Sequence, residues 1–276
     1  MGSDGSVGTL EGKAATEETE DTGILIFGMI MAVQVSAEEN PAAEGFDAAG
    51  SDAKAIEVAD GVMAAMGGRK AWDDTRFITW KFFGRRLHVW DKHTGNIRVE
   101  SQDRKTKKNR VVLMNIHSKD GRAWEEGVEI TDGEALKKAI RGAEGAWIND
   151  SYWLVMPYKL KDSGVTLKYV GEKADPDGNA CEVLELTFKE VGRTPQNKYN
   201  VFVDKASKMV VHWDYWKDKA VDEPRSLGPW SNWGKFGNIM LTEDHGKRKH
   251  ADVAVFESLP DKVFADPAAF KIEDYQ

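Results

Sequence analysis

Short segments in which apolar and polar residues alternate recur along most of this chain, and turn-forming residues separate them at intervals of roughly ten residues. Residues 77–83 and 211–216 are examples, and both carry large aromatic side chains. A β-strand points successive side chains to opposite faces, so each such segment predicts a strand. A regular series of about eleven strands favours one antiparallel sheet, curved or partly closed, over alternating βαβ units.

The chain is therefore expected to be mainly β with some α-helix, an α+β fold. The predicted strands occupy residues 76–84, 86–92, 97–101, 110–117, 122–127, 152–156, 166–171, 182–191, 198–204, 209–217, 236–243 and 251–256.

Helical spacing of apolar residues appears at two places. Residues 51–66 predict a helix that Gly67 and Gly68 would end, because glycine tolerates left-handed dihedral angles. A second helix is expected to begin at Thr131, which forms a capping-box pair with Glu134. A further short helix is predicted over residues 142–149.

The chain contains ten tryptophans, and most of them fall inside the strand patterns. So many large aromatic residues are consistent with a packed core, but they also suit a wide apolar hollow that holds a ligand. A one-residue slip in any strand would move its aromatic residues to the other face. The candidates for the hollow are Trp80, Phe82, Trp90, Met114, Trp153, Met156, Phe188, Phe202, Trp213 and Met240.

A long segment rich in proline, glycine and tryptophan, residues 222–234, interrupts the strand series. Loops of this length are often functional. Trp230 and Trp233 are candidates for a lid or rim over the hollow or for a partner contact, and the alternative is that they cap the open end of the sheet.

The N-terminal part suggests export. Residues 23–33 form an apolar stretch too short to span a bilayer but suited to the core of a signal peptide, and residues 35–37 (Val-Ser-Ala) suit cleavage near Ala37. The acidic residues before this stretch are atypical of a signal peptide, and the alternative is a short buried helix or strand. We expect a leader over 1–37, a disordered linker over 38–50 and one domain over 51–276, exported and soluble.

The net charge of −8 disfavours nucleic-acid binding, which needs a basic surface. The run at residues 104–110 is the basic exception, and it suits either a solvated hairpin tip or a docking patch for an acidic partner or anionic lipid. The single Cys181 is expected to be a buried apolar residue. His88 and His212 are the histidines that could meet across strands, but no third metal ligand is in view.

Residues 147–160 (WINDSYWLVMPYKL) and residues 256–264 (FESLPDKVF) resemble segments of the periplasmic lipoprotein-localisation family, which includes the LolA/LolB-like and outer-membrane lipoprotein-sorting proteins. The order of leader, first helix, strands, helical insertion and closing strands is similar as well. The resemblance covers residues 51–267.

This resemblance implies an unclosed, half β-barrel whose concave side is covered by helices and lined by apolar side chains. It further implies a periplasmic, monomeric carrier whose hollow accepts acyl chains. The ligand would be a lipid or an acylated lipoprotein, and the partner would be a membrane-associated donor or acceptor protein. No cofactor or metal is expected. The family also holds its lid with an arginine in an early strand, and Arg98 occupies a similar place, although pairing with Glu100 is the simpler alternative.

Two other functions compete with a lipid carrier. A carbohydrate-binding protein would present Trp216, Trp230 and Trp233 as a flat, exposed row. A hydrolase would need polar catalytic groups that converge in the hollow, and Asp150, Asp162 and other acidic residues show no dyad-like spacing. The sequence thus favours a binding protein over an enzyme.

Overall fold

The computed structural model describes residues 39–189 and 192–275. The apolar stretch at 23–33 and the expected cleavage site at 35–37 lie outside the described residues. The described chain is mainly β with α-helices, and its strands are antiparallel in sheets that do not close on themselves. This confirms the fold class expected from the sequence.

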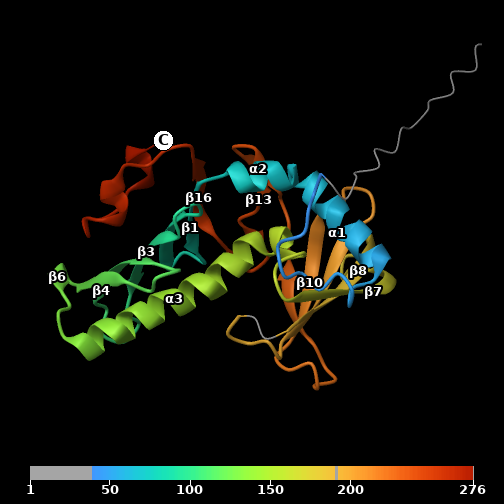
Figure 1. Ribbon diagram of the computed structural model, residues 1–276, viewed down its shortest axis with the longest axis horizontal. Helices are drawn as coiled ribbons and strands as arrows, with labels where there is room; N and C mark the ends of the chain where they lie inside the picture. Colours follow the sequence, from blue (N-terminus) through green and yellow to red (C-terminus); the bar gives the residue numbers. More distant parts are fainter. Residues whose placement is uncertain (1–38, 190–191, 276) are drawn as a thin grey trace, which may run out of the picture. The chain divides into compact units, whose positions relative to one another are not determined.

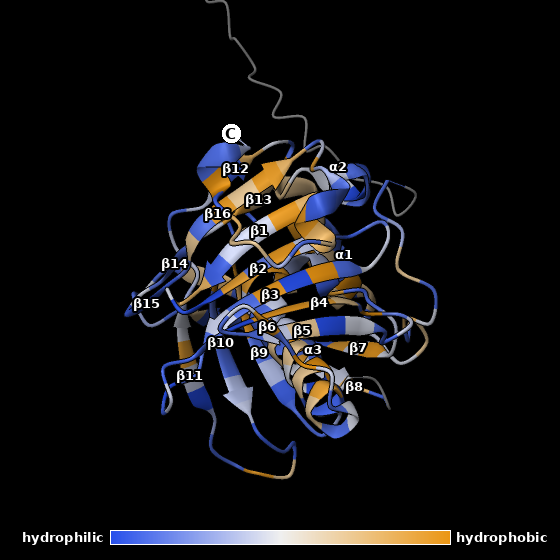
Figure 2. Ribbon diagram, turned by 90° about the vertical axis from the view of Figure 1, so that its left-hand side faces the viewer, coloured by the Kyte–Doolittle hydropathy of each residue, from blue (hydrophilic) through white to orange (hydrophobic). Residues whose placement is uncertain are grey.

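The larger sheet, sheet A, has seven strands, and Figure 2 shows them stacked in order from β16 to β5 and β6. Every neighbouring pair in it is antiparallel. In sheet order its strands are β16 (Ala251–Phe256), β1 (Phe77–Phe82), β2 (Arg86–Asp91), β3 (Asn96–Gln102), β4 (Asn109–Asn115), β5 (Gly121–Glu125) and β6 (Val128–Glu129).

The second sheet, sheet B, has five strands, and two short hairpins complete the strand inventory of the described residues. Sheet B contains, in order, β11 (Arg225–Pro229), β10 (Val210–Trp216), β9 (Lys198–Asp204), β8 (Ala180–Phe188) and β7 (Val165–Ala174). The hairpins pair β12 (Gly234–Phe236) with β13 (Ile239–Leu241), and β14 (Asp244–His245) with β15 (Arg248–Lys249).

The strands thus form two main sheets rather than the single sheet expected from their spacing. The division falls where the long helix α3 (Gly133–Val155) separates β6 from β7. Figure 1 shows α3 running from beside β4 and β6 to the neighbourhood of β10. Spacing along the sequence cannot reveal this division, because hydrogen bonding between strands that are not consecutive decides sheet membership.

Helix α3 also corrects the sequence prediction for residues 142–156. A single 23-residue helix replaces the predicted short helix and the predicted strand at 152–156. Its buried residues include Ala139, Ala143, Asp150 and Leu154, which recur at helical spacing. The helix is capped by Asp132, whose side chain accepts a hydrogen bond of 2.8 Å from the Ala135 amide, instead of by the expected Thr131–Glu134 pair.

The remaining helices are short, and the first is the one predicted. They are α1 (Ala53–Ala65), α2 (Gly68–Asp74) and the 3₁₀ turns η1 (Met156–Lys159), η2 (Asp261–Phe264) and η3 (Ile272–Asp274). Gly67 follows α1 with a φ of 108°, and a Cβ there would lie 2.3 Å from the Asn238 carbonyl oxygen. Glycine is therefore required both for the left-handed conformation and for the close approach of two backbones.

The main hydrophobic core lies between α1, the C-terminal end of α3 and the facing sides of both sheets. It joins Val58 and Val62 of α1 to Ile78 of sheet A and to Leu184 and Val201 of sheet B, all of them buried. A second cluster packs the first half of α3 on sheet A, and a third packs the C-terminal residues on the other side of sheet A.

Residues 39–50, which the sequence assigns to a disordered linker, pack on the domain instead. Asn40 is buried, and its side-chain oxygen accepts a hydrogen bond of 2.9 Å from the Arg69 amide. The ammonium group of Lys161 donates to the Asn40 carbonyl oxygen and to Asp60. Composition misses this because most of these contacts are hydrogen bonds of the backbone, such as those from the Ala43 and Asp47 amides to the carbonyl oxygens of Lys161 and Val165, and only Phe46 packs against the main core.

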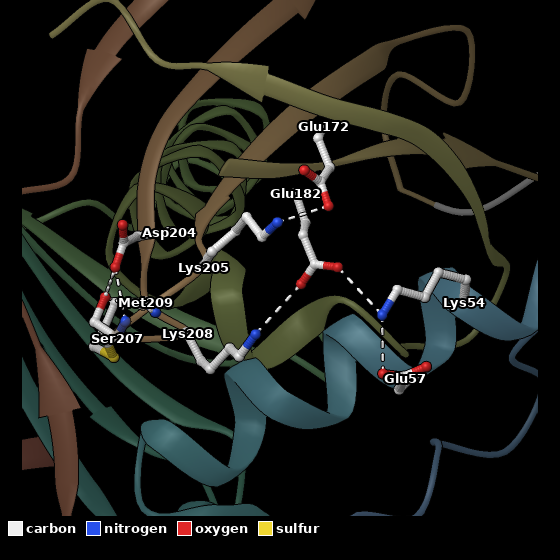
Figure 3. Close-up of polar contacts among 9 residues, drawn as sticks. All are labelled: Lys54, Glu57, Glu172, Glu182, Asp204, Lys205, Ser207, Lys208 and Met209. Atoms are coloured by element: carbon white, nitrogen blue, oxygen red, sulfur yellow. Dashed lines mark hydrogen bonds and ion pairs between the residues drawn. The ribbon is translucent and has the colours of Figure 1, made fainter. Parts of the chain in front are cut away.

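Helix α1 is held on sheet B by a buried carboxylate as well as by its apolar face. Figure 3 shows Glu182 of β8 between Lys54 of α1 and Lys208 of the β9–β10 turn, with N–O distances of 3.2 and 3.4 Å. The Glu182 side chain is only 7% exposed, so two cations compensate its lost hydration. This arrangement fixes α1 over the strands that form the candidate site.

Candidate functional site

A cavity of about 470 Å³ lies between the C-terminal half of α3 and sheet B. One wall is helical, and the other comes from β8 to β11 and from the segment before β9. The lining residues are Gly145, Ile148, Asn149, Tyr152, Trp153, Phe188, Gly192, Arg193, Thr194, Asn197, Tyr199, Trp213, Tyr215 and Leu227. We call this cavity the aromatic pocket.

Aromatic rings form most of the apolar surface of the pocket. The Trp213 ring stacks on Tyr199 at 5.5 Å between centroids and meets Trp153 edge to face at 4.9 Å. Tyr152 of α3 approaches Tyr199 at 5.5 Å, and Phe188 meets Tyr199 edge to face at 5.9 Å. These rings support one another across the helix–sheet boundary, so the apolar wall is preformed.

Two buried polar hydrogens sit among these rings without a partner. The Tyr152 hydroxyl and the Trp213 indole nitrogen make no hydrogen bond among the described residues. Burial raises the pKa of Tyr152 well above its usual value and that of Tyr199 to about 12, so both phenols stay neutral. A ligand with a hydrogen-bond acceptor would satisfy such donors.

Among the described residues of the pocket lining, Arg193 is the only one with a charged side chain. Its guanidinium group lies against α3, where it donates to the Glu144 carboxylate at 3.0 Å and to the Arg141 carbonyl oxygen at 3.3 Å. A Cβ on Gly145 would lie 2.3 Å from Arg193 Nη1, so the bare backbone of that glycine makes room for the guanidinium.

The structure brings together three of the ten residues predicted to line a hollow, namely Trp153, Phe188 and Trp213. The other seven do not line the aromatic pocket. Trp80, Phe82 and Met156 are buried in the main core, Met240 packs against it, and Trp90 and Met114 lie beneath α3 on sheet A.

Phe202 lies on the opposite side of sheet B, in a small cluster with Cys181 and Val183. It is one residue from Val201 and Val203, which face the main core, so the period of two excludes it from the pocket face. The cluster also agrees with the expectation that Cys181 is a buried apolar residue.

The predicted lid or rim tryptophans are not at an open rim. Trp230 is 1% exposed and stacks on Trp233 at 5.6 Å, while the Trp233 indole donates a hydrogen bond of 2.9 Å to the Val210 carbonyl oxygen. Trp216 is also buried. The exposed row of these three rings that a carbohydrate platform requires is therefore absent from the described part of the chain.

Arg98 likewise does not hold a lid over the pocket. Its buried guanidinium pairs with Glu100 at 2.6 Å, as the simpler alternative has it, and also donates to carbonyl oxygens of the C-terminal segment, residues 257–275. Val263 and Asp266 accept at 3.0 and 2.7 Å. Arg98 thus fastens this segment to sheet A on the side away from α3.

Replacing Arg98 with methionine is expected to lower the free energy of unfolding by about 2–4 kcal/mol, because hydrogen bonds to a buried charge are lost and the carbonyl oxygens lose their donor. Hydrogen exchange should rise first in residues 263–270. Arg122, whose pair with Glu129 is exposed, offers a matched Arg122→Met control that should cost under about 1 kcal/mol. Equal losses in the two variants would contradict this role of Arg98.

The sequence prediction missed Tyr152, Tyr199, Tyr215, Leu227 and Arg193. Tyr199, Val201 and Val203 are two residues apart, so they lie on the same, core-facing side of β9. This spacing could have identified Tyr199 from the sequence. Tyr152 would have been found if residues 147–156 had been assigned to a helix, since it lies one turn from Ile148. Arg193 carries no comparable signal.

A buried ionic cluster lies between α3 and β2, beside the pocket. Both oxygens of the fully buried Asp150 carboxylate accept hydrogen bonds from the Arg86 guanidinium at 2.7 Å, and His88 Nε2 lies 2.7 Å from Oδ2. Burial alone would raise the pKa of Asp150, but the hydrogen bonds from His88 and Arg86 hold it below its usual value. Burial lowers the pKa of His88.

This cluster joins α3 to β2, and His88 does not meet His212 as a metal pair would require. His212 belongs to sheet B, where its Nε2 lies 3.2 Å from Asp214. No group of three or more acidic, histidine or cysteine side chains within the described ranges is arranged to hold a metal ion.

Comparison with known proteins finds structural likeness but no sequence match. No family model and no curated protein matches the chain. A DUF1329 family protein from Desulfovibrio piger is 14% identical with a TM-score of 0.39, over 80% of this chain and 99% of that one. A LolA superfamily protein from Nitrosomonas europaea is also 14% identical with a TM-score of 0.39, over 76% and 96%.

A TM-score of this size says nothing about ligand or activity, which depend on the pocket itself. Among the helices of the described residues, none is both long and apolar enough to cross a bilayer.

Proposed function

We propose that this protein binds an apolar ligand with an acyl chain in the aromatic pocket and acts as a carrier that shields the chain from water. The observation that carries the proposal is the lining of the pocket, in which six aromatic side chains surround a cavity of about 470 Å³. Cavities of this size and composition are typical of small-molecule sites.

Burial in the pocket can hold an acyl chain without any covalent bond. Each methylene group moved from water into an apolar cavity contributes about 0.8 kcal/mol, so a chain of several methylenes could be held by burial alone. The unpartnered donors of Tyr152 and Trp213 would then orient the polar end of the ligand, as a few polar groups do in most apolar sites.

The pocket lining favours retention over bond cleavage. Its described residues include no carboxylate, imidazole or thiol that could act as a general acid, base or nucleophile. The nearby Asp150 carboxylate is fully buried and already engaged by Arg86 and His88. A hydrolase would need such groups to converge in the cavity.

We infer an exported, periplasmic carrier whose natural ligand is a lipid or an acylated lipoprotein and which exchanges it with a membrane-associated donor or acceptor. The apolar stretch at residues 23–33 would direct the export, and the carrier would act as a monomer.

Replacing Leu227 with tryptophan is expected to weaken binding of a fluorescent fatty acid about tenfold or more. Leu227 lies half-buried in the pocket wall on β11, so the larger ring would displace methylenes of the ligand, and about two lost methylenes correspond to roughly a tenfold change. Titration followed by fluorescence measures the affinity, and native mass spectrometry shows which lipid copurifies.

Val221→Trp is the matched control, because it adds the same ring on an exposed residue of the β10–β11 connection. Its affinity should equal that of the unmodified protein. A protein that binds no fluorescent fatty acid and copurifies with no lipid would overturn the proposed function, and equal affinities for both variants would place the ligand elsewhere.

A further inference from the structure

Basic side chains gather at one end of sheet A although the whole chain has a net charge of −8. β2 and β3 are antiparallel with Leu87 opposite Glu100, so the beginning of β2 lies beside the end of β3. The β1–β2 turn at residues 83–85 and the β3–β4 turn at residues 103–108 therefore leave the sheet at the same end. The basic run expected to be a hairpin tip is this second turn.

The two turns share a groove of about 610 Å³ that contains many more cations than anions. Its lining includes Arg85, Arg104, Lys105 and Lys107, and Asp103 is the one acidic residue among the described residues that line it. The Asp103 carboxylate is engaged within its own turn, where it accepts from the backbone amides of residues 105 and 106 at 2.9 and 2.8 Å. One carboxylate cannot balance these four cations, so the groove carries a net positive charge.

A third basic turn, between β14 and β15, lies against the first. The Arg248 guanidinium carbon stands 6.0 Å from the ring centre of Phe83 in the β1–β2 turn. The same carbon is 5.4 Å from the ring centre of Trp153, which lines the aromatic pocket. Arg248 of the third turn therefore lies close both to the β1–β2 turn and to the wall of the aromatic pocket.

Six cations on these turns have no carboxylate within ion-pair distance among the described residues, although Lys108 and Lys249 beside them are paired with Glu125 and Asp244. We call this set the basic turns; its members are Arg85, Arg104, Lys105, Lys107, Lys247 and Arg248. All six are exposed.

We propose that the basic turns bind the phosphate groups of an anionic lipid surface. Unpaired cations on several protruding turns suit a surface of many mobile phosphates better than one fixed ligand, because each long side chain can reach a phosphate independently. Arg248 places this contact beside Trp153, so a membrane-bound protein would hold its pocket near the lipid. The proposed membrane contact extends the proposed function, but its test measures vesicle binding and does not depend on ligand binding in the aromatic pocket.

The test is cosedimentation of the full chain with vesicles of phosphatidylcholine alone or mixed with an equal amount of phosphatidylglycerol. Binding is expected only to the mixed vesicles and should weaken at high ionic strength. Each lysine or arginine near an anionic surface contributes roughly fivefold, so the triple variant R104E/K105E/K107E should bind about a hundredfold more weakly. The double variant K247E/R248E, on a separate turn, should also lose binding.

K217E/K219E/K235E is the matched control, because it changes the net charge equally through three exposed lysines for which the described residues provide no ion pair. It should bind the mixed vesicles at least ten times more tightly than R104E/K105E/K107E does. This tenfold limit is smaller than the hundredfold loss expected for that variant, so the two variants can be distinguished. Equal loss in both triple variants, or no binding to mixed vesicles by the unmodified protein, would overturn the proposal.

Two further arms separate the alternatives. Inorganic tripolyphosphate that competes at the affinity of the vesicles would assign the basic turns to a soluble anion and overturn the membrane proposal. Leu227→Trp, which fills the aromatic pocket, should bind the mixed vesicles as the unmodified protein does. Loss of fatty-acid binding in the pocket would therefore leave vesicle binding unchanged. Loss of vesicle binding by the basic turns would leave fatty-acid binding unchanged.

Discussion

Replacing Asp150 with alanine is expected to lower the free energy of unfolding by about 3–5 kcal/mol. The Asp150 side chain is fully buried, and its removal leaves the Arg86 guanidinium and the buried His88 ring without their common partner. Breaking a buried ion pair by removing one member costs this much because the remaining charge is desolvated and uncompensated. Chemical denaturation followed by circular dichroism measures the loss.

The same substitution should weaken ligand binding in the aromatic pocket. Asp150 fixes α3 to β2, and the neighbouring Asn149, Tyr152 and Trp153 form the helical wall of the pocket. Asp74→Ala provides the control, since its pair with Lys70 is exposed and should contribute under about 1 kcal/mol. A loss of similar size in both variants would show that the buried cluster does not hold α3.

Acidification from pH 6.5 to pH 4 is expected to destabilise the protein by roughly 5 kcal/mol through His245 and His250 alone. Both rings are buried among Phe83, Trp153 and Trp230. Burial lowers the pKa of His245 to about 3 and that of His250 to about 4, and for His245 the neighbouring His250 lowers it further.

The sign follows from proton binding. Between pH 6.5 and about 4 the unfolded chain binds protons on these histidines, whereas the folded protein keeps both rings neutral. The unfolded state is therefore favoured as the pH falls, by up to about 1.4 kcal/mol per histidine for each pH unit. The stability that the neutral rings contribute is complete above pH 6.5 and is lost as the pH falls toward their folded pKa values.

His245→Phe removes one of these groups and keeps an aromatic ring in the same contacts. The slope of unfolding free energy against pH should become shallower by about 1.4 kcal/mol per unit, measured by urea denaturation at several pH values. Identical slopes for this variant and the unmodified protein would show that His245 is not titrated on unfolding.

Local patterns were sufficient for most of the strands and for the first helix. Tyr199, Val201 and Val203 recur at every second position of their strand, and the helix at 51–66 has its apolar face and its glycine stop. They failed at residues 147–156, where aromatic residues that favour strands form the end of α3. Tertiary packing overrides propensity there, because the helix buries Leu154 in the main core and Asp150 against Arg86 and His88.

The sequence by itself determined a strand-rich chain with aromatic side chains at alternating positions, because the period of two is a property of the backbone. Only the tertiary structure decided that the strands form two sheets, that α3 crosses from one to the other, and that Trp153, Phe188 and Trp213 meet around a cavity while Trp80 and Trp230 are core. The reason is that sheet membership and pocket lining depend on contacts between residues far apart in the sequence. A local sequence pattern does not specify which of these residues come into contact.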